Sequence, residues 1–223
     1  VNILEELDSP GEWFLDRNKG LLYFWPPDKI ENSQISLTMF DEDYMVSIEG
    51  ASYVKFRGLT FGLSRRNGIR IRGGQGNVFA GCTFKNMGGM AASIDENQKN
   101  TNAGNGLLSC DIYGMGTTGI RLGGGNRKTI EPGENFAINN HIYKCGRRIQ
   151  TYTPAIKLSG VGNRVSNNLI HHMPHFAVMF SGNEHIIELN EIHRVALKFS
   201  DAGAIYTAAN PFNRGTVIQH NFI

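Results

Sequence analysis

The strongest constraint on the fold is a short pattern that recurs along most of the chain. Each occurrence has a small or apolar residue, an apolar residue, a variable residue and usually a second apolar residue, followed by a turn. The pattern occurs seven times, as MVSIEG (45–50), GIRIRGG (68–74), AASIDEN (91–97), GIRLGGG (119–125), AIKLSG (155–160), AVMFSG (177–182) and AIYTAAN (204–210). Positions two residues apart face the same side of a β-strand. The pattern therefore predicts strands that bury one face.

A second motif lies between these runs and fixes the length of the repeat. Its central residue is, in order, Leu59, Cys82, Cys110, Asn140, Asn168, Asn190 and Asn221. These residues are 23, 28, 30, 28, 22 and 31 positions apart, so a basic unit of about 22 residues carries loops of varying length. Such a period, with short strands and glycine turns, is typical of a parallel β-solenoid. We predict an all-β protein with a parallel β-helix of about seven coils.

The asparagines of the second motif have a physical role in such a fold. Identical amides stacked at the spacing of adjacent strands can hydrogen-bond along the stack and satisfy buried groups at a sharp turn. Cys82 and Cys110, which begin the column, replace the amide with a small apolar side chain. Stacked side chains point the same way rather than at each other, so we expect free thiols.

The stretch VSNNLIHHMPHFAVMFSG (165–182) shows how one coil is expected to run. Residues 165–167, 169–171 and 177–180 form three strands, with Asn168 at the first turn and a loop over 172–176. Two other folds fit less well. A doubly wound α/β fold needs helices with a period of 3.6 residues, which the sequence lacks, and an antiparallel sandwich would not keep the columns in register.

The first part of the chain has a different pattern. The segment GEWFLDRNKGLLYFWPP (11–27) places two aromatic-rich runs around DRNKG, which predicts a β-hairpin with Gly20 in the turn. We expect residues 1–43 to form a cap or lead-in segment and residues 44–223 to form the β-helix. The aromatic side chains either cover the open end of the solenoid or present a surface for sugars. The last residues begin another coil without a cap, so we expect the β-helix to be truncated at Ile223.

Composition argues against several classes of function. The formal net charge of +2 gives no strong attraction to nucleic acid, and no apolar stretch is long enough to span a membrane. No signal-like segment is present at the start. The cysteines have no CxxC spacing, and no calcium-loop or zinc pattern occurs. We therefore expect no cofactor and no metal, although carboxylates from neighbouring coils could still build a site.

Inward side chains fill the core of a β-helix, so function depends on outward positions and loops. The outward residues between the two apolar columns are Ser47, Arg70, Ser93, Arg121, Lys157, Met179 and Tyr206. Long loops flank this face, over 143–154 and 194–203 before the strands and over 95–105, 123–135 and 208–214 after them. A flat sheet walled by loops suits an extended polymer, and Arg121 beside Lys157 favours acidic groups on it. Alternatively, both are solvated surface charges.

The most informative local sequence is SDAGAIYT (200–207). Asp201 lies three residues before a predicted strand, at the edge of the groove, and Tyr206 is on the exposed face. His175 takes nearly the same place one coil earlier. The catalytic candidates of this acid–base cluster are Asp201, His175 and Lys157. The candidates for substrate binding are Arg121, Tyr206, Arg70 and His172. Alternatively, Asp201 caps the backbone of a turn.

Other titratable residues are weaker candidates. His171 and His193 align at the ends of successive strands. Three roles are open for them: stacking on each other, binding a metal, or only ending the strands. Glu184, Glu188 and Glu191 fall on the other sheets and are expected to be solvated. Asp95 and Glu96 belong to the opposite wall of the groove from Asp201.

Three segments carry a resemblance to a known family: the hairpin GEWFLDRNKGLLYFWPP, the run NNLIHHMPHFAVMFSGNEHIIELNEIH (167–193) and the block SDAGAIY (200–206). Over nearly the whole chain they resemble bacterial right-handed parallel β-helix proteins of carbohydrate metabolism, in particular the group around glycoside hydrolase family 141. The resemblance implies a secreted or periplasmic enzyme that acts on a plant or algal polysaccharide or oligosaccharide. Asp201 matches an acidic position of that block and would be one of the paired carboxylates of such hydrolases.

Three functions remain open at this point. A glycoside hydrolase would use Asp201 with a second carboxylate, while His175, Lys157, Arg121 and Tyr206 orient the sugar. A polysaccharide lyase would use Lys157 or His175 to abstract a proton beside a uronate, with Arg121 neutralising its carboxylate. A non-catalytic solenoid would bind glycan without turnover. A second carboxylate within about 5–10 Å of Asp201 would separate hydrolysis from binding.

Overall fold

The computed structural model describes residues 3–32, 35–94 and 103–223. The chain divides into two compact units, Val1–Leu37 and Thr38–Ile223, close to the boundary that the sequence predicts at residue 43. Asp95 and Glu96, expected at one wall of the groove, lie outside the described residues.

The smaller unit is built around the predicted hairpin. Strands β1 (Trp13–Asp16) and β2 (Leu21–Phe24) pair antiparallel, with Trp13 opposite Phe24. Gly20 has a φ of +65°, the left-handed conformation that a glycine adopts without a steric cost. The Asp16 carboxylate accepts hydrogen bonds from the backbone N–H groups of Asn18 and Lys19, each at 3.1 Å. Two short 3₁₀ helices, η1 (Leu4–Glu6) and η2 (Ile30–Asn32), flank the hairpin.

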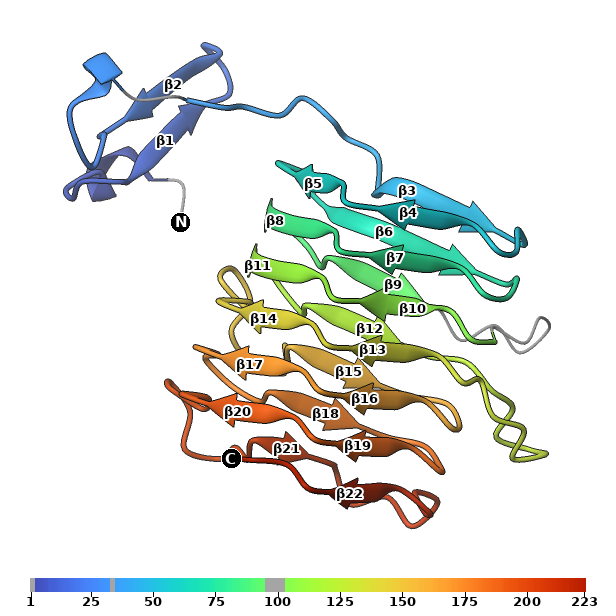
Figure 1. Ribbon diagram of the computed structural model, residues 1–223. Coiled ribbons are helices and arrows are strands. Elements are labelled where there is room, and N and C mark those ends of the chain that lie inside the picture. The colour runs from blue at the N-terminus through green and yellow to red at the C-terminus, as the bar shows by residue number, and fades with distance from the viewer. Residues whose placement is uncertain (1–2, 33–34, 95–102) are drawn as a thin grey trace. The chain divides into compact units, whose positions relative to one another are not determined.

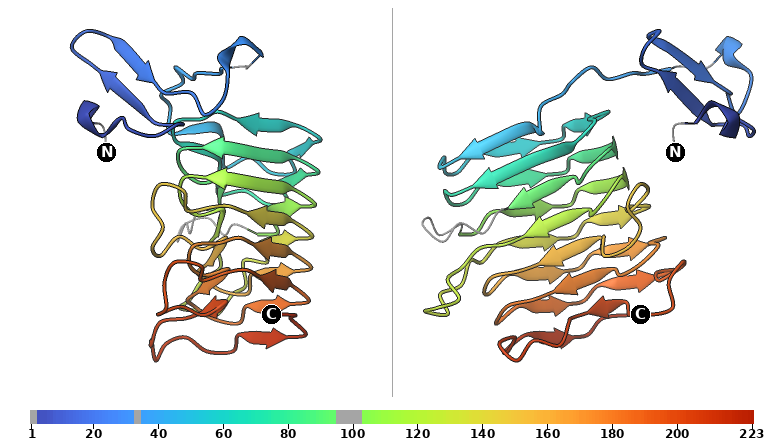
Figure 2. Two further views of the ribbon diagram at one scale, coloured as in Figure 1. Left: turned by 90° about the vertical axis from the view of Figure 1, so that its left-hand side faces the viewer. Right: turned by 180° about the vertical axis from the view of Figure 1, so that it is seen from behind.

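The larger unit is a parallel β-helix, as predicted, whose strands stack coil upon coil into three parallel sheets (Figures 1 and 2). The groove sheet contains, in spatial order, β3 (Tyr44–Glu49), β6 (Asn67–Arg72), β9 (Ala92–Ile94), β12 (Ile120–Leu122), β15 (Ile156–Leu158), β18 (Val178–Phe180) and β21 (Ile205–Tyr206). The histidine sheet contains β5 (Thr60–Gly62), β8 (Thr83–Met87), β11 (Asp111–Met115), β14 (His141–Tyr143), β17 (Leu169–His171) and β20 (Glu191–His193). The third sheet contains β4 (Lys55–Arg57), β7 (Val78–Ala80), β10 (Gly106–Leu108), β13 (Phe136–Ile138), β16 (Arg164–Ser166), β19 (Ile186–Glu188) and β22 (Val217–Gln219).

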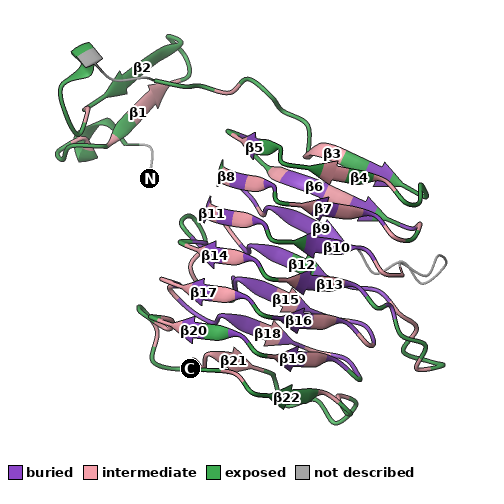
Figure 3. Cartoon of the chain, viewed as in Figure 1, coloured by how far each residue is buried: buried purple, intermediate pink, exposed green. Residues whose placement is uncertain are grey.

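Both apolar columns of the groove sheet are in the register that the sequence predicts. Ile156 pairs with Ile120 on one side and with Val178 on the other, and Leu158 pairs with Leu122 and Phe180. The side chains of Ile120, Ile156 and Val178 are fully buried, and strands of the middle coils are largely buried in Figure 3. Burying an aliphatic side chain of this size contributes about 1.5–3 kcal/mol, so the repeated columns stabilise the stack coil by coil.

The predicted asparagine column forms a hydrogen-bonded ladder. The Asn168 side-chain oxygen accepts from the backbone N–H of Asn140 at 2.9 Å and from its side-chain NH₂ at 3.0 Å. Asn190 accepts in the same way from Asn168, and Asn221 from Asn190. Asn168 and Asn190 are about 1% exposed, so the ladder satisfies buried donors at the turn between the third sheet and the histidine sheet.

A second asparagine ladder, which the sequence analysis did not predict, lies at the turn before the third sheet. The backbone N–H groups of Asn77, Asn105 and Asn135 donate to the side-chain oxygens of Asn105, Asn135 and Asn163 at 2.9–3.1 Å. The Asn163 N–H donates to Nδ1 of buried His185 at 3.2 Å, so a histidine ends this ladder. Two of the three corners of the coil are therefore fixed by buried amides.

All three cysteines are free and buried, as expected for stacked side chains. Burial raises the pKa of both Cys110 and Cys145 to about 12, which keeps these thiols protonated and unreactive. The Cys110 N–H donates to Asn140 Oδ1 at 2.9 Å and so joins the first ladder. Among the described residues, no helix has the length and apolar character required to cross a membrane.

Candidate functional site

The outward positions of the groove sheet are in the register that the sequence predicts, except that Ser93, expected on the exposed face, is buried (1% exposed). Paired strands place Ser47 beside Arg70, Arg121 beside Lys157, and Met179 beside Tyr206. Adjacent strands are about 4.8 Å apart, so one column brings side chains from six of the seven coils onto a single strip of surface, interrupted at the buried Ser93. Its central positions contain no carboxylate.

The two central cations of this column are unpaired. Arg121 is exposed and Lys157 half-buried, and neither has an ion-pair or hydrogen-bond partner for its side chain among the described residues. Two like charges on adjacent strands repel each other, and an anion between them removes that cost. This pair is therefore a candidate site for an anionic ligand on the face.

Arg70, predicted to bind substrate, already interacts with side chains of the neighbouring strand β3. One terminal amino group donates to Glu49 Oε1 at 2.7 Å and contacts the Ser47 hydroxyl at 3.3 Å. Its guanidinium carbon also lies 4.8 Å from the centre of the Tyr44 ring. Its Nε is buried and has no hydrogen-bond partner within the described residues. Arg70 is therefore less available to an anionic ligand than Arg121.

Asp201 lies in the loop before β21, at the edge of the groove sheet, as expected. Asp201 is exposed, and its carboxylate has no hydrogen-bond or ion-pair partner in the described parts of the chain. It therefore does not cap a turn, which was the alternative. Its backbone carbonyl oxygen is 3.4 Å from His175 Nε2. The carboxylate is free to act on a ligand.

The expected catalytic role of His175 is corrected by its surroundings. The side chain is 4% exposed, and its Nδ1 accepts a hydrogen bond from the Tyr152 N–H at 3.0 Å. Neutral His175 therefore carries its proton on Nε2, which faces the Asp201 carbonyl. The ring also stacks on Phe176 with centroids 3.6 Å apart. His175 ties together the loops of three coils and does not present a base to the groove.

Tyr206 is on the predicted face and is held by aromatic packing. Its ring stacks on Phe176 with a centroid distance of 4.3 Å and an interplanar angle of 14°. Phe176 is 1% exposed and also packs edge-on against Tyr152. Tyr206 is therefore preorganised at one end of the column, close in sequence to Asp201.

His172, predicted to bind substrate in the groove, belongs instead to the histidine sheet. It directly follows β17, with a φ of +52°, and its Nδ1 lies 2.6 Å from Nδ1 of His171. His171 stacks on His193 with centroids 5.1 Å apart, which is one of the arrangements that the sequence left open. In the described part of the chain, no group of three or more His, Cys, Asp or Glu side chains is arranged to hold a metal ion.

A feature that the sequence analysis missed lies where two of the predicted wall loops meet. The loop over 123–135 follows β12, and the loop over 208–214 follows β21. They carry the NRK tripeptide (126–128) and the NR dipeptide (213–214), whose cations line a hollow of about 570 Å³ at the ends of the groove-sheet strands. The clustering of cations in two loops was the available signal, but the sequence does not show that the loops meet.

Comparisons with known proteins add no assignment. No family model, curated protein or solved structure matches the chain.

Proposed function

We propose that this protein is a polysaccharide-cleaving enzyme that holds an extended, acidic glycan across the groove sheet. The observation that carries the proposal is the unpaired Arg121–Lys157 pair at the centre of a surface column without carboxylates. Guanidinium and ammonium groups bind the carboxylates of uronates and the oxygens of sulfate esters. A column that crosses successive coils offers repeated contacts to a polymer rather than a single closed pocket.

For the reaction, we propose hydrolysis with Asp201 as one carboxylate. Some carboxylates of the β-helix are engaged by neighbouring cations, Glu49 by Arg70 and Glu188 by Arg164. Asp201 has no such partner among the described residues, is exposed, and lies in the loop that leads into β21, the strand that carries Tyr206. A free carboxylate at the edge of a glycan-binding face can serve as a general acid or base. The second carboxylate that hydrolysis requires is not among the central outward positions of the groove sheet.

Elimination is the second candidate, and the cation pair favours it. In its neutral amine form, Lys157 would abstract the proton beside the uronate carboxyl group while the neighbouring Arg121 neutralises that carboxylate. The electron pair then forms a carbon–carbon double bond as the bond to the leaving oxygen breaks, and the leaving oxygen takes a proton from solvent to become a hydroxyl group. The adjacent positions of Lys157 and Arg121 on paired strands support this candidate.

One assay separates these chemistries. Purified protein is incubated with polygalacturonate, alginate and neutral xylan, and both new reducing ends and ultraviolet absorbance are measured. Hydrolysis produces reducing ends without absorbance, whereas elimination produces an absorbing unsaturated sugar. We expect Asp201→Asn to lower hydrolysis by at least about 100-fold, since a positioned acid or base contributes that much. Glu191→Gln, an exposed carboxylate on the histidine sheet, is the matched control.

The other outcomes have equally direct meanings. Loss of an absorbing product in Lys157→Met, with Asp201→Asn active, would assign elimination. Glycan binding that survives Asp201→Asn, with no turnover by any variant or by the wild type, would assign a binding module. Equal binding of acidic and neutral glycans would contradict the proposed role of the cation pair.

A further inference from the structure

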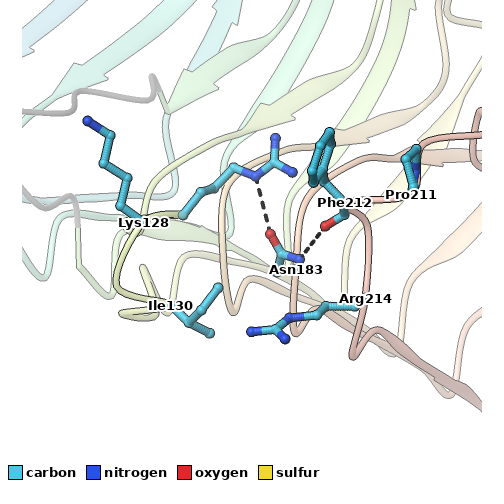
Figure 4. Close-up of a pocket in the computed structure, with 7 residues that line it drawn as sticks. Lys128, Ile130, Asn183, Pro211, Phe212 and Arg214 are labelled. Carbon is cyan, nitrogen blue, oxygen red and sulfur yellow. Dashed lines mark hydrogen bonds between the residues drawn. The ribbon is translucent and has the colours of Figure 1, made fainter.

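The hollow beside the groove sheet has an unusual balance of charge. It is lined by Arg127, Lys128, Ile130, Asn183, Pro211, Phe212 and Arg214 (Figure 4). Three of these residues are cations, and none is a carboxylate. The three side chains are exposed and form no ion pair within the described residues. The local field is therefore positive, although the whole chain carries a formal charge of only +2.

Asn183 fixes the geometry of this hollow. Its side chain is 3% exposed, its oxygen accepts from Arg127 Nε at 3.2 Å, and its NH₂ donates to the Phe212 carbonyl at 2.7 Å. One buried amide thus joins the two loops, as Figure 4 shows. Because Nε of Arg127 is occupied, the two terminal amino groups of the guanidinium are left for a ligand.

The backbones that carry the other cations are also held. The Arg214 carbonyl accepts from the Glu184 N–H at 3.0 Å, and Asn183 forms a parallel bridge with Arg214. Asn126 and Glu131 exchange backbone hydrogen bonds at 2.8 and 3.2 Å, which closes the short loop that presents Arg127 and Lys128. The backbone positions that present the cations, and the Arg127 side chain itself, are therefore held before any ligand arrives.

One neighbouring carboxylate reduces this charge without pairing with it. The Glu184 side chain lies against Gly215, the residue after Arg214, and lines an adjacent hollow, but it forms no ion pair with the three cations among the described residues. His185 is fully buried, and burial lowers its pKa; Arg127 lowers the pKa further, while the hydrogen bond to the Ser181 carbonyl and the Glu184 charge only partly oppose this. This histidine therefore stays neutral near pH 7 and adds no charge. Phe212, 75% exposed, adds an apolar ring to the rim of the hollow.

We infer that this hollow is an anchoring subsite for an anionic substituent, a carboxylate or sulfate ester, of the glycan. The inference rests on the proposed function for the identity of the polymer. Arg127 and Arg214 offer planar forks that match the paired oxygens of either group. The exposed Phe212 ring gives the attached sugar an apolar face to pack against. The hollow lies at the ends of β12, β18 and β21, so a chain crossing the groove sheet reaches it.

The test measures binding, so it does not depend on turnover. Isothermal titration compares a uronate oligosaccharide, a sulfated oligosaccharide, a neutral oligosaccharide and inorganic sulfate, with wild type and the double variant Arg127→Gln/Arg214→Gln. We expect the double variant to lose about tenfold or more in affinity for the acidic oligosaccharides and nothing for the neutral one. The loss is expected to shrink at high salt because free ions screen the charges. Arg57→Gln, an exposed and unpaired arginine on β4, is the control and is expected to match wild type.

Further variants keep the inference open to refutation. Arg127→Lys retains the charge but loses the Nε hydrogen bond, so it is expected to recover only part of the affinity. Phe212→Ala is expected to weaken the acidic oligosaccharides without changing sulfate binding. Loss of sulfate binding alone, with oligosaccharide affinities unchanged, would mean a free-anion site and would overturn the subsite. Wild-type affinity of the double variant for every probe would also overturn it, provided that thermal denaturation shows it folded.

Failure of the subsite and failure of the proposed function are distinguishable. If Arg121→Gln/Lys157→Gln binds acidic glycan normally while Arg127→Gln/Arg214→Gln does not, the anionic subsite is supported and glycan binding by the central cation pair is contradicted. The reverse result removes the subsite and retains the proposed function.

Discussion

Two outer faces of the same β-helix differ in whether their polar side chains interact with one another. On the histidine sheet, side chains of neighbouring coils bind one another, whereas on the groove sheet Arg121 and Lys157 have no partner among the described residues. The backbone spacing is the same on both faces, so the difference comes from the side chains. A face whose polar groups satisfy each other gains rigidity, and a face that leaves charges unpaired retains them for a ligand.

The histidine face contains a continuous chain of contacts. Nδ1 of His141 is 3.1 Å from an Asp111 carboxylate oxygen, within ion-pair distance although not in good hydrogen-bond geometry. Nε2 of His141 is 2.8 Å from Nε2 of His171, and Nδ1 of His171 is 2.6 Å from Nδ1 of His172. Nε2 of His172 is 3.3 Å from an Arg194 amino group.

The two ends of this chain determine where its protons lie. Asp111 at one end favours a proton on Nδ1 of His141, so Nε2 accepts from His171. Arg194 can only donate, so Nε2 of His172 accepts and its Nδ1 donates to His171. In their neutral forms, the three imidazoles of this chain then each have one tautomer. The ring stack of Tyr113, Tyr143, His171 and His193 holds the same face together, with centroids 5.0–5.1 Å apart.

The largest expected effect is on the unpaired face. Arg121→Gln/Lys157→Gln is expected to reduce affinity for an acidic oligosaccharide about 100-fold, since two charge-assisted contacts are lost. Its thermal stability is expected to stay at or slightly above that of wild type, because repulsion between the cations is removed. Titration calorimetry and thermal denaturation measure the two quantities. His193→Gln, on the histidine sheet, is the control, and an equal loss of affinity in that variant would erase the distinction between the faces.

The paired face is expected to respond to pH through stability. Burial lowers the pKa of His171 to about 4, from an ordinary value of 6.5, with His141, His172, His193 and Arg194 adding repulsion. Between these values the unfolded chain binds a proton that the folded chain does not, so stability is lost as pH falls from about 6.5 to about 4. The loss is expected to be about 1 kcal/mol, because the ring is only partly buried and solvent screens the repulsion.

Urea denaturation at pH 7 and pH 4.5 measures this loss. His171→Gln is expected to lose less stability across the interval than wild type. His220→Gln removes a histidine outside the cluster and is expected to behave as wild type. The same pH dependence in all three proteins would show that the cluster has no special role.

The sequence predicted what depends on the repeat and missed what depends on how loops pack. Arg121 and Lys157 were placed side by side correctly because strand register follows from the apolar columns. The second ladder was also available, since Asn77, Asn105 and Asn135 keep the 28- and 30-residue gaps of the first ladder. Its asparagines precede strands of variable composition, so no apolar pattern marked them.

The misplaced histidines have a different cause. The positive φ of His172 turns its backbone at a corner of the coil, and the ring joins His171 on the histidine sheet rather than the groove. Burial of His175 depends on Phe176 and on Tyr152 from another coil. These contacts join residues separated by an inserted loop, and the repeat alone does not specify them.

The smallest expected effect tests the comparison within one face. Arg70 is in the same outward column as Arg121 but is engaged by Glu49, whose pKa is lowered chiefly by the hydrogen bond from Ser47 and also by Arg70. A cation that already has a partner gains less from an incoming anion, because that contact must first be given up. Arg70→Gln is therefore expected to change affinity for acidic oligosaccharides by less than about twofold and stability by about 0.5 kcal/mol or less. A loss in titration calorimetry as large as that of Arg121→Gln would show that position in the column, and not the absence of a partner, decides which cations bind the glycan.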